Sequence, residues 1–255
     1  MNMSVNFPNS KSKHLNTEQT NAFGHRVDQI RREVMDSLGE QDAKYIYKIR
    51  NFVRYSEITS RGMLMFGGWI PPVWVVGTGL LGISKIVENM ELGHNVMHGQ
   101  FDWLNDPNLN GANYDWDTMS SGDDWKYTHN YIHHTYTNIV GKDHDVGYGL
   151  LRVSESQKWE PRFLLNIPLA IQLMVFFEWY VGVQNLHLED ALIYKTKTWK
   201  QVWADASKFR KKVRRQVLKD YVFFPVIAGP NALPVFAGNA VANVIRSLWS
   251  SAVIF

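Results

Sequence analysis

The chain begins with a polar segment, residues 1–26, which is followed by an amphipathic segment, residues 27–55. In residues 27–55, the apolar side chains of Ile30, Val34 and Leu38 recur at helical spacing among charged residues. This spacing is typical of a helix with one apolar face. The first 26 residues show no such period. We therefore expect a polar, mobile tail at residues 1–26, followed by one domain over residues 27–255.

Two apolar segments follow, separated by a pair of prolines. Residues 63–70 and 73–83 are apolar, and Pro71 and Pro72 lie between them. A helix needs about 20 residues to cross a bilayer, which carries the second segment to roughly residue 92. In that extension Lys85 and Glu88 are three residues apart, so they are expected to pair on one helix face. The pattern predicts a transmembrane helical hairpin that turns at the prolines.

A second pair of apolar segments, residues 221–229 and 235–255, flanks a turn rich in glycine and proline. Residues 208–219, just before it, contain seven basic residues and no acid. The positive-inside rule places such a run in the cytoplasm. A single crossing by the apolar residues 163–186 would put the run outside, so that segment is predicted to be an in-plane or buried helix. The predicted fold is all-α, an integral membrane protein with two transmembrane helical hairpins and a cytoplasmic helical cap.

Composition narrows the chemistry and the partners. The 255 residues include no cysteine, which excludes disulfides, thiolate zinc sites and a thiol nucleophile. The net charge is +3, but the basic residues are concentrated rather than spread, and 13% of the residues are aromatic. These features favour membrane lipid over nucleic acid as a partner. Residues 99–125 hold six aspartates and no lysine or arginine, which indicates an aqueous segment.

Two clusters of histidine carry the candidate chemistry. His94 and His98 are four residues apart, as are His129 and His133, and His134 follows directly. On a helix, residues four apart lie on one face, so each pair presents two imidazoles together. Imidazole is a natural ligand for iron, zinc, copper and nickel. The spacing and the clustering together predict a metal site in the cytoplasmic cap.

Other metal and hydrolytic chemistries lack their residues. Asn95 follows His94, where a zinc protease helix carries a glutamate, and a zinc deaminase needs cysteine ligands. All-imidazole ligation without an obvious acid or base favours redox chemistry at the metal. The remaining histidines are expected to be surface or structural residues: His14, His25, His144 and His187.

The two clusters resemble the boxes of the membrane-bound, histidine-box fatty acid desaturases, especially the bacterial acyl-CoA or acyl-lipid branch. GHNVMHGQFDW is similar to the first box of that family, and WKYTHNYIHHTYTN followed by GKDHD is similar to the second. The resemblance covers roughly residues 61–255. It is specific because two motifs occur in the family's order beside apolar segments.

The resemblance implies a fatty acid desaturase with two iron ions held by His94, His98, His129, His133 and His134. Such an enzyme uses O2 and two electrons to introduce a cis double bond into a long acyl chain, carried on CoA or on a lipid. The electrons would come from a donor of the ferredoxin, ferredoxin reductase or cytochrome type. The three polar residues after the second box are expected to hold the imidazole rings in place: Asn138, Asp143 and Asp145.

One part of the family pattern is missing. The family has a third box, His-x-x-His-His, beyond the second hairpin, and this sequence contains none. We expect an N-terminal fragment of a longer protein that is inactive by itself. Two alternatives remain open, a related histidine-box hydroxylase of alkanes, sterols or carotenoids, and a non-catalytic membrane metal-binding protein.

Overall fold

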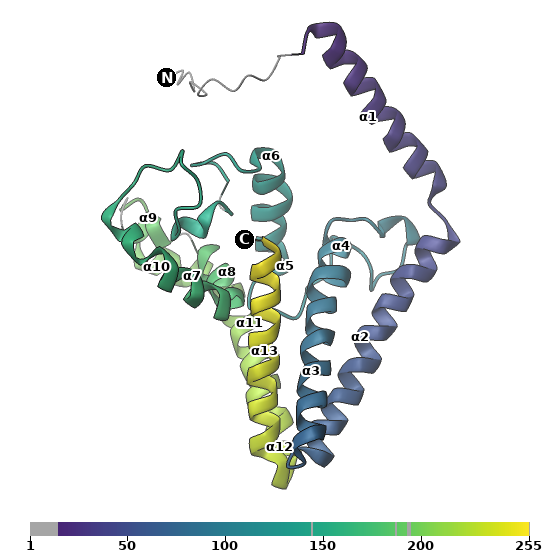
Figure 1. Ribbon diagram of the computed structural model, residues 1–255, viewed down its shortest axis with the longest axis vertical. Coiled ribbons are helices and arrows are strands. Elements are labelled where there is room, and N and C mark those ends of the chain that lie inside the picture. The colour runs from purple at the N-terminus through teal and green to yellow at the C-terminus, as the bar shows by residue number, and fades with distance from the viewer. Residues whose placement is uncertain (1–14, 144, 187, 193–194, 255) are drawn as a thin grey trace. The chain divides into compact units, whose positions relative to one another are not determined.

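The fold is helical throughout the part of the chain that the computed structural model describes, with no strand in it (Figure 1). The described residues are 15–143, 145–186, 188–192 and 195–254. The all-α prediction is confirmed. Contacts within the chain define two compact units, Met1–Tyr45 and Ile46–Phe255. The domain boundary expected after residue 26 stays a prediction.

The first helix, α1 (Thr17–Ser37), begins ten residues earlier than the predicted helix over residues 27–55. Asn16 and Gln19 form a capping box, in which the Asn16 side chain accepts the Gln19 backbone N–H at 2.8 Å. The reciprocal bond from the Asn16 N–H to the Gln19 side chain is 3.0 Å long. This reciprocal pairing satisfies two free N–H groups and fixes the start of the helix. The helix ends before Gly39, a poor helix former, so the single predicted helix is two helices.

The expected first hairpin consists of α2 (Glu40–Gly67) and α3 (Pro71–Val87). Both prolines lie in the first turn of α3, where a missing N–H costs no hydrogen bond. The connection is therefore residues 68–70, just ahead of the prolines. At Gly68 an added Cβ would lie 2.5 Å from the Leu64 carbonyl oxygen, so the tight turn requires glycine.

The remaining helices build the rest of the second unit. Three of them are π-helical: η1 (Glu88–Gly93), η3 (Lys126–His133) and η6 (Leu218–Phe223). The short 3₁₀ turns are η2 (Asp102–Leu104), η4 (Gly147–Gly149), η5 (Pro161–Leu165) and η7 (Gly229–Asn231). The α-helices are α4 (His94–Met97), α5 (Gly122–Trp125), α6 (His134–Tyr136), α7 (Asn166–Val175), α8 (Phe177–Gln184), α9 (Leu188–Leu192), α10 (Trp199–Asp205), α11 (Ser207–Val217), α12 (Phe224–Ile227) and α13 (Ala232–Ile254).

Helices α3 and α13 lie side by side and form the main packing surface of the second unit (Figure 1). Leu81 and Ala242 are fully buried in one apolar cluster between them. A Cβ added at Gly82 would lie 2.9 Å from the Ile245 side chain. Close approach of the two helices therefore depends on Gly82. This contact lies near the end of α3, which leads into the first histidine motif.

A buried carboxylate, Asp220 in η6, ties these helices together. Its side chain is fully buried and accepts hydrogen bonds from Lys85 at 2.8 Å and from Arg61 at 3.1 Å. The predicted pairing of Lys85 with Glu88 is wrong, because Lys85 turns into the bundle toward Asp220. Opposite charges attract more strongly in the low-dielectric interior than on the helix surface. The buried contact with Asp220, which is distant in the sequence, is therefore favoured over a local pair with Glu88.

No single helix in the described ranges is both long and apolar enough to cross a bilayer. Pro161–Val175 and Phe177–Gln184 meet those requirements only as a pair, and the pair is bent by 97°. Where an in-plane or buried helix was expected over residues 163–186, the structure has this bent pair. The two transmembrane hairpins stay a prediction.

The aspartate-rich stretch at residues 99–125 pairs with the basic run at residues 208–219. The ion pairs are Lys208 with Asp123 (2.9 Å), Lys212 with Asp115 (2.9 Å), and Lys219 with Asp117. Lys212 is buried, so the run is only partly an exposed surface. These contacts hold the segment that leads into the second histidine motif against α11.

Candidate metal centre

Both histidine motifs are built on π-helical turns. The π-helical segment η1 ends where His94 begins α4, and η3 contains His129 and His133. A π turn adds a residue to the helix and rotates the side chains that follow, and such turns occur often at functional sites. Ser121 starts the second motif by accepting the Asp124 backbone N–H at 3.2 Å, as expected for an N-cap.

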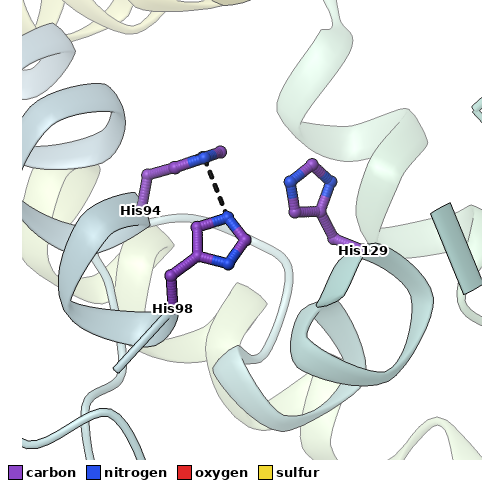
Figure 2. Close-up of side chains that lie close together, drawn as sticks. All are labelled: His94, His98 and His129. Carbon is purple, nitrogen blue, oxygen red and sulfur yellow. Dashed lines mark hydrogen bonds between the residues drawn. The ribbon is translucent and has the colours of Figure 1, made fainter. Parts of the chain in front are cut away.

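The five predicted imidazoles converge on one place. His94 and His98 approach to 3.1 Å between their Nε2 atoms, and Figure 2 shows His129 facing both rings from the opposite helix. One ligand atom from each of these three residues lies within 4.8 Å of the others. The His134 ring centroid is 4.9 Å from that of His98 and 4.9 Å from that of His129. His133 stacks on His129 at 5.0 Å between centroids.

Two aspartates after the second motif contact its histidines. Asp143 is buried and its Oδ2 lies 2.9 Å from His133 Nδ1. The same oxygen accepts the Asn138 backbone N–H at 2.7 Å, so the carboxylate is held from two sides. A carboxylate on Nδ1 makes that nitrogen the donor and leaves Nε2 free for a metal. The contact is compatible with the role expected of Asp143, which stays a prediction.

Asp145 approaches two of the histidines of the second motif. Its Oδ2 is 3.6 Å from His129 Nδ1 and 3.5 Å from His133 Nδ1. These three residues form a second group whose ligand atoms lie within 4.8 Å of one another. Asn138 donates its backbone N–H to Asp143, and Asn138 also lines a cavity next to the cluster. His129 is common to both groups, which makes it the centre of the cluster.

Three imidazoles of the cluster, those of His94, His98 and His134, have lowered pKa values. Burial, with further contributions from His129, His98 and His134, lowers the pKa of His94 to about 3. Burial, together with His129 and His134, lowers the pKa of His98 to about 4. The pKa of His134 is also lowered, first by burial and then by its histidine neighbours. A neutral imidazole carries the lone pair that binds a metal, so these rings are ready to bind at neutral pH.

Two further residues shape the site and were missed in the sequence. Trp125 is buried and stacks on His129, with 4.4 Å between ring centroids and 20° between planes. Its position four residues before His129 is the signal that could have identified it. Asn130 donates from Nδ2 to the Met97 carbonyl at 3.0 Å and so links the two motifs. Nothing in the local sequence marks that long-range contact.

A cavity of about 370 Å³ adjoins the cluster. His94, His129 and His133 form one part of its wall. Other parts are aromatic and aliphatic and come from several helices and one loop: Met90, Trp116, Tyr148, Phe177, Val181 and Val253. An apolar cavity beside a cluster of metal-binding side chains suits an apolar substrate that reacts at the metal.

The other histidines do not join the cluster where the structure describes them. His25 is exposed on α1, as expected for a surface residue. His14, His144 and His187, also expected to be structural, lie outside the described residues.

The fold and the site define an all-helical protein with an imidazole-rich candidate metal centre beside an apolar cavity. The family model described as fatty acid desaturase matches residues 68–255. The chain belongs to the fatty acid desaturase family, as the resemblance predicted. No solved structure shows a significant match to the chain.

Similar proteins carry two different desaturase names. The chain is 42% identical over 247 residues to the NADPH-dependent stearoyl-CoA 9-desaturase of Mycobacterium tuberculosis. That match covers 95% of this chain and 57% of the relative, so the chain spans little more than half of the relative's length. It is also 33% identical over 124 residues to the sn-1 linoleoyl-lipid 6-desaturase of Synechocystis sp., a match over 46% of this chain and 34% of the relative.

Proposed function

We propose that the protein is a membrane fatty acyl desaturase that introduces a cis double bond into a long acyl chain. The observation that carries the proposal is the convergence of five imidazoles beside the apolar cavity. The names of the relatives support either acyl-CoA or acyl lipid as the carrier.

Iron is the metal that fits this reaction. His94, His98, His129, His133 and His134 would hold it, and imidazoles together with two carboxylates suit a non-haem iron centre. Asp143 would orient His133, and Asp145 would either bind iron or orient His129. Members of this family use two iron ions. Bound iron would activate O2 so that it can break unactivated C–H bonds.

The residues of the chain contribute binding and orientation. The cavity walls would hold the acyl chain away from water, with one carbon pair beside the histidines. Holding the reacting carbons in a fixed position lowers the barrier to the reaction and determines where the double bond forms. The overall stoichiometry takes O2, two electrons and two protons with the saturated chain, and yields the alkene and two waters. The NADPH-dependent relative supports a reduced nicotinamide as the electron source, through a donor of the ferredoxin, ferredoxin reductase or cytochrome type.

A multi-pass membrane position with the histidines on the cytoplasmic side completes the proposal. Large apolar side chains point outward from α3 and α13, including Val75, Val76, Leu233 and Phe236, which are 45–65% exposed. An apolar surface of this kind is rarely left in water, so membrane lipid is the expected neighbour. Lys211, Arg214 and Arg215 are exposed on α11 and would face an acidic electron donor or lipid headgroups.

Product analysis tests the proposal. The full-length gene product, with iron, O2 and an electron donor, receives a saturated long-chain acyl-CoA or a saturated acyl lipid. We expect a product that has lost two hydrogens and carries one cis double bond, identified by gas chromatography with mass spectrometry. A hydroxylated chain without any alkene, or no oxidised product from either carrier, would contradict the proposal.

Replacing Asp143 with asparagine should weaken the iron site without removing a histidine. The change takes away the charge that polarises His133 Nδ1 across 2.9 Å. Partners of this kind contribute about 10–100-fold in metal affinity, so iron affinity should fall by that factor. Competition with a chelator measures it. Asp36→Asn, on exposed α1, is the matched control and should leave the affinity unchanged. Equal affinities for the two variants would show that Asp143 has no such role.

A further inference from the structure

The π turn ahead of the first histidine motif places Asn89 beside the candidate metal centre. The His94 backbone N–H donates to the Asn89 carbonyl, which is five residues earlier in the chain. This bond defines one π turn, so Asn89 and His94 lie above one another on the same side of the helix. Both residues line the cavity. An α-helical register would have put Asn89 on a different face from His94.

Asn89 has hydrogen-bonding capacity that the protein does not use. It is 3% exposed, and neither Nδ2 nor Oδ1 has a partner among the described residues. Two other polar side chains of the cavity wall do have partners: the hydroxyl groups of Thr118 and Thr128 donate to backbone carbonyls. A buried amide without a partner destabilises the fold, so such groups are few in native proteins and point to a ligand or a bound water.

Another residue of the cavity wall, Arg246, also has a donor without a partner among the described residues. Arg246, 2% exposed, binds Glu178 and the Asp117 carbonyl through its two terminal nitrogens, but its Nε has no partner in the described part of the chain. Arg246 lines the cavity together with Asn89. The wall of the mainly apolar cavity therefore includes two residues with unused polar atoms, which an acyl chain cannot satisfy.

We propose that Asn89 is a positioning residue that hydrogen-bonds a small oxygen-bearing ligand, water in the resting protein, in the cavity beside the metal centre. An amide offers one donor group and one acceptor, and water is complementary because it both accepts and donates. The inference rests on the proposed function, since it assumes iron at the histidines. Asn89 would fix where that ligand sits relative to the iron and the acyl chain, without binding iron itself.

The variant Asn89→Leu tests this role, because leucine keeps the shape and removes both polar atoms. Thr78→Val is the matched control. Thr78 is 3% exposed, its hydroxyl has no partner among the described residues, and it is not part of the cavity wall. Deleting an unused buried polar group is neutral or stabilising, so both variants should unfold at the same temperature as the parent or at a higher one.

Azide titration of the iron-loaded, full-length protein separates the two variants. Azide replaces water on iron and can accept a hydrogen bond from Nδ2, and optical absorption follows its binding. We expect Asn89→Leu to weaken azide binding up to about tenfold, the loss of one hydrogen bond. Thr78→Val should leave azide binding unchanged, and both variants should retain the parent's iron content by elemental analysis.

The outcomes separate the inference from the proposed function. Unchanged azide affinity in Asn89→Leu, with normal iron content, overturns the role of Asn89 and leaves the desaturase proposal intact. A parent protein that takes up no iron overturns both. An equal loss of azide affinity in Thr78→Val also overturns the inference, because it assigns the effect to packing rather than to the amide.

Discussion

Replacing His129 with alanine is expected to abolish iron binding and desaturation. This ring belongs to both groups of candidate ligands. Its centroid lies 5.1 Å from that of His94 and 5.4 Å from that of His98, and it also contacts both histidines that follow it. No other imidazole among the described residues has this central position. Because even residues that only orient a ligand contribute about 10–100-fold, the loss of iron affinity should exceed about 100-fold.

The control for this variant is His25→Ala, which removes an exposed histidine on α1. Iron content and product formation should match the parent in the control and fall together in His129→Ala. Circular dichroism should show the same helix content in both proteins. Full iron content in His129→Ala would contradict the assignment of this residue to the metal centre.

Replacing Asp220 with asparagine is expected to have the largest effect on stability. The carboxylate is fully buried and neutralises both Lys85 and Arg61, which are themselves 5% and 7% exposed. Arg61 also pairs with Glu57 at 2.8 Å, and Lys85 lies 3.7 Å from Asp117, but both of these carboxylates are more exposed than Asp220. Removing the fully buried partner from such a set of charges typically costs about 3–5 kcal/mol. The free energy of unfolding in denaturant should fall by about that amount.

Glu40→Gln gives the comparison on the surface. Glu40 pairs with Lys44 at 2.8 Å, but both side chains are more than two-thirds exposed. Exposed pairs contribute little, so this variant should unfold at the same denaturant concentration as the parent. If the two variants unfold alike, the Asp220 cluster does not hold α2, α3 and η6 together.

The clustering of the histidines was readable from the sequence because residues four apart on a helix share one face. Histidines four residues apart identified the five imidazoles, and their short distance from Asp143 in the chain identified its partner. The π turns were not predicted, since a π turn differs from an α turn by one residue and leaves no compositional mark. Asn89 was missed for that reason, because its position relative to His94 depends on the π register.

The fold was predictable in its helices and less so in its contacts. The capping box at Asn16 and Gln19 was visible in the sequence and would have given the true start of α1. The pairing of Lys212 with Asp115 joins residues 97 positions apart, which no local rule reaches. The sequence showed that residues 99–125 are acidic and that residues 208–219 are basic. Which lysine meets which aspartate depends on how α11 packs.

The most direct test of the account is X-ray absorption at the iron edge of the purified full-length protein, with metal content determined on the same sample. We expect iron to be the main metal and the scattering to show several imidazole ligands, and we expect both signals to be lost in His129→Ala. Zinc as the main metal, or iron without imidazole ligands, would contradict the assignment of the histidine cluster as the iron centre of a desaturase.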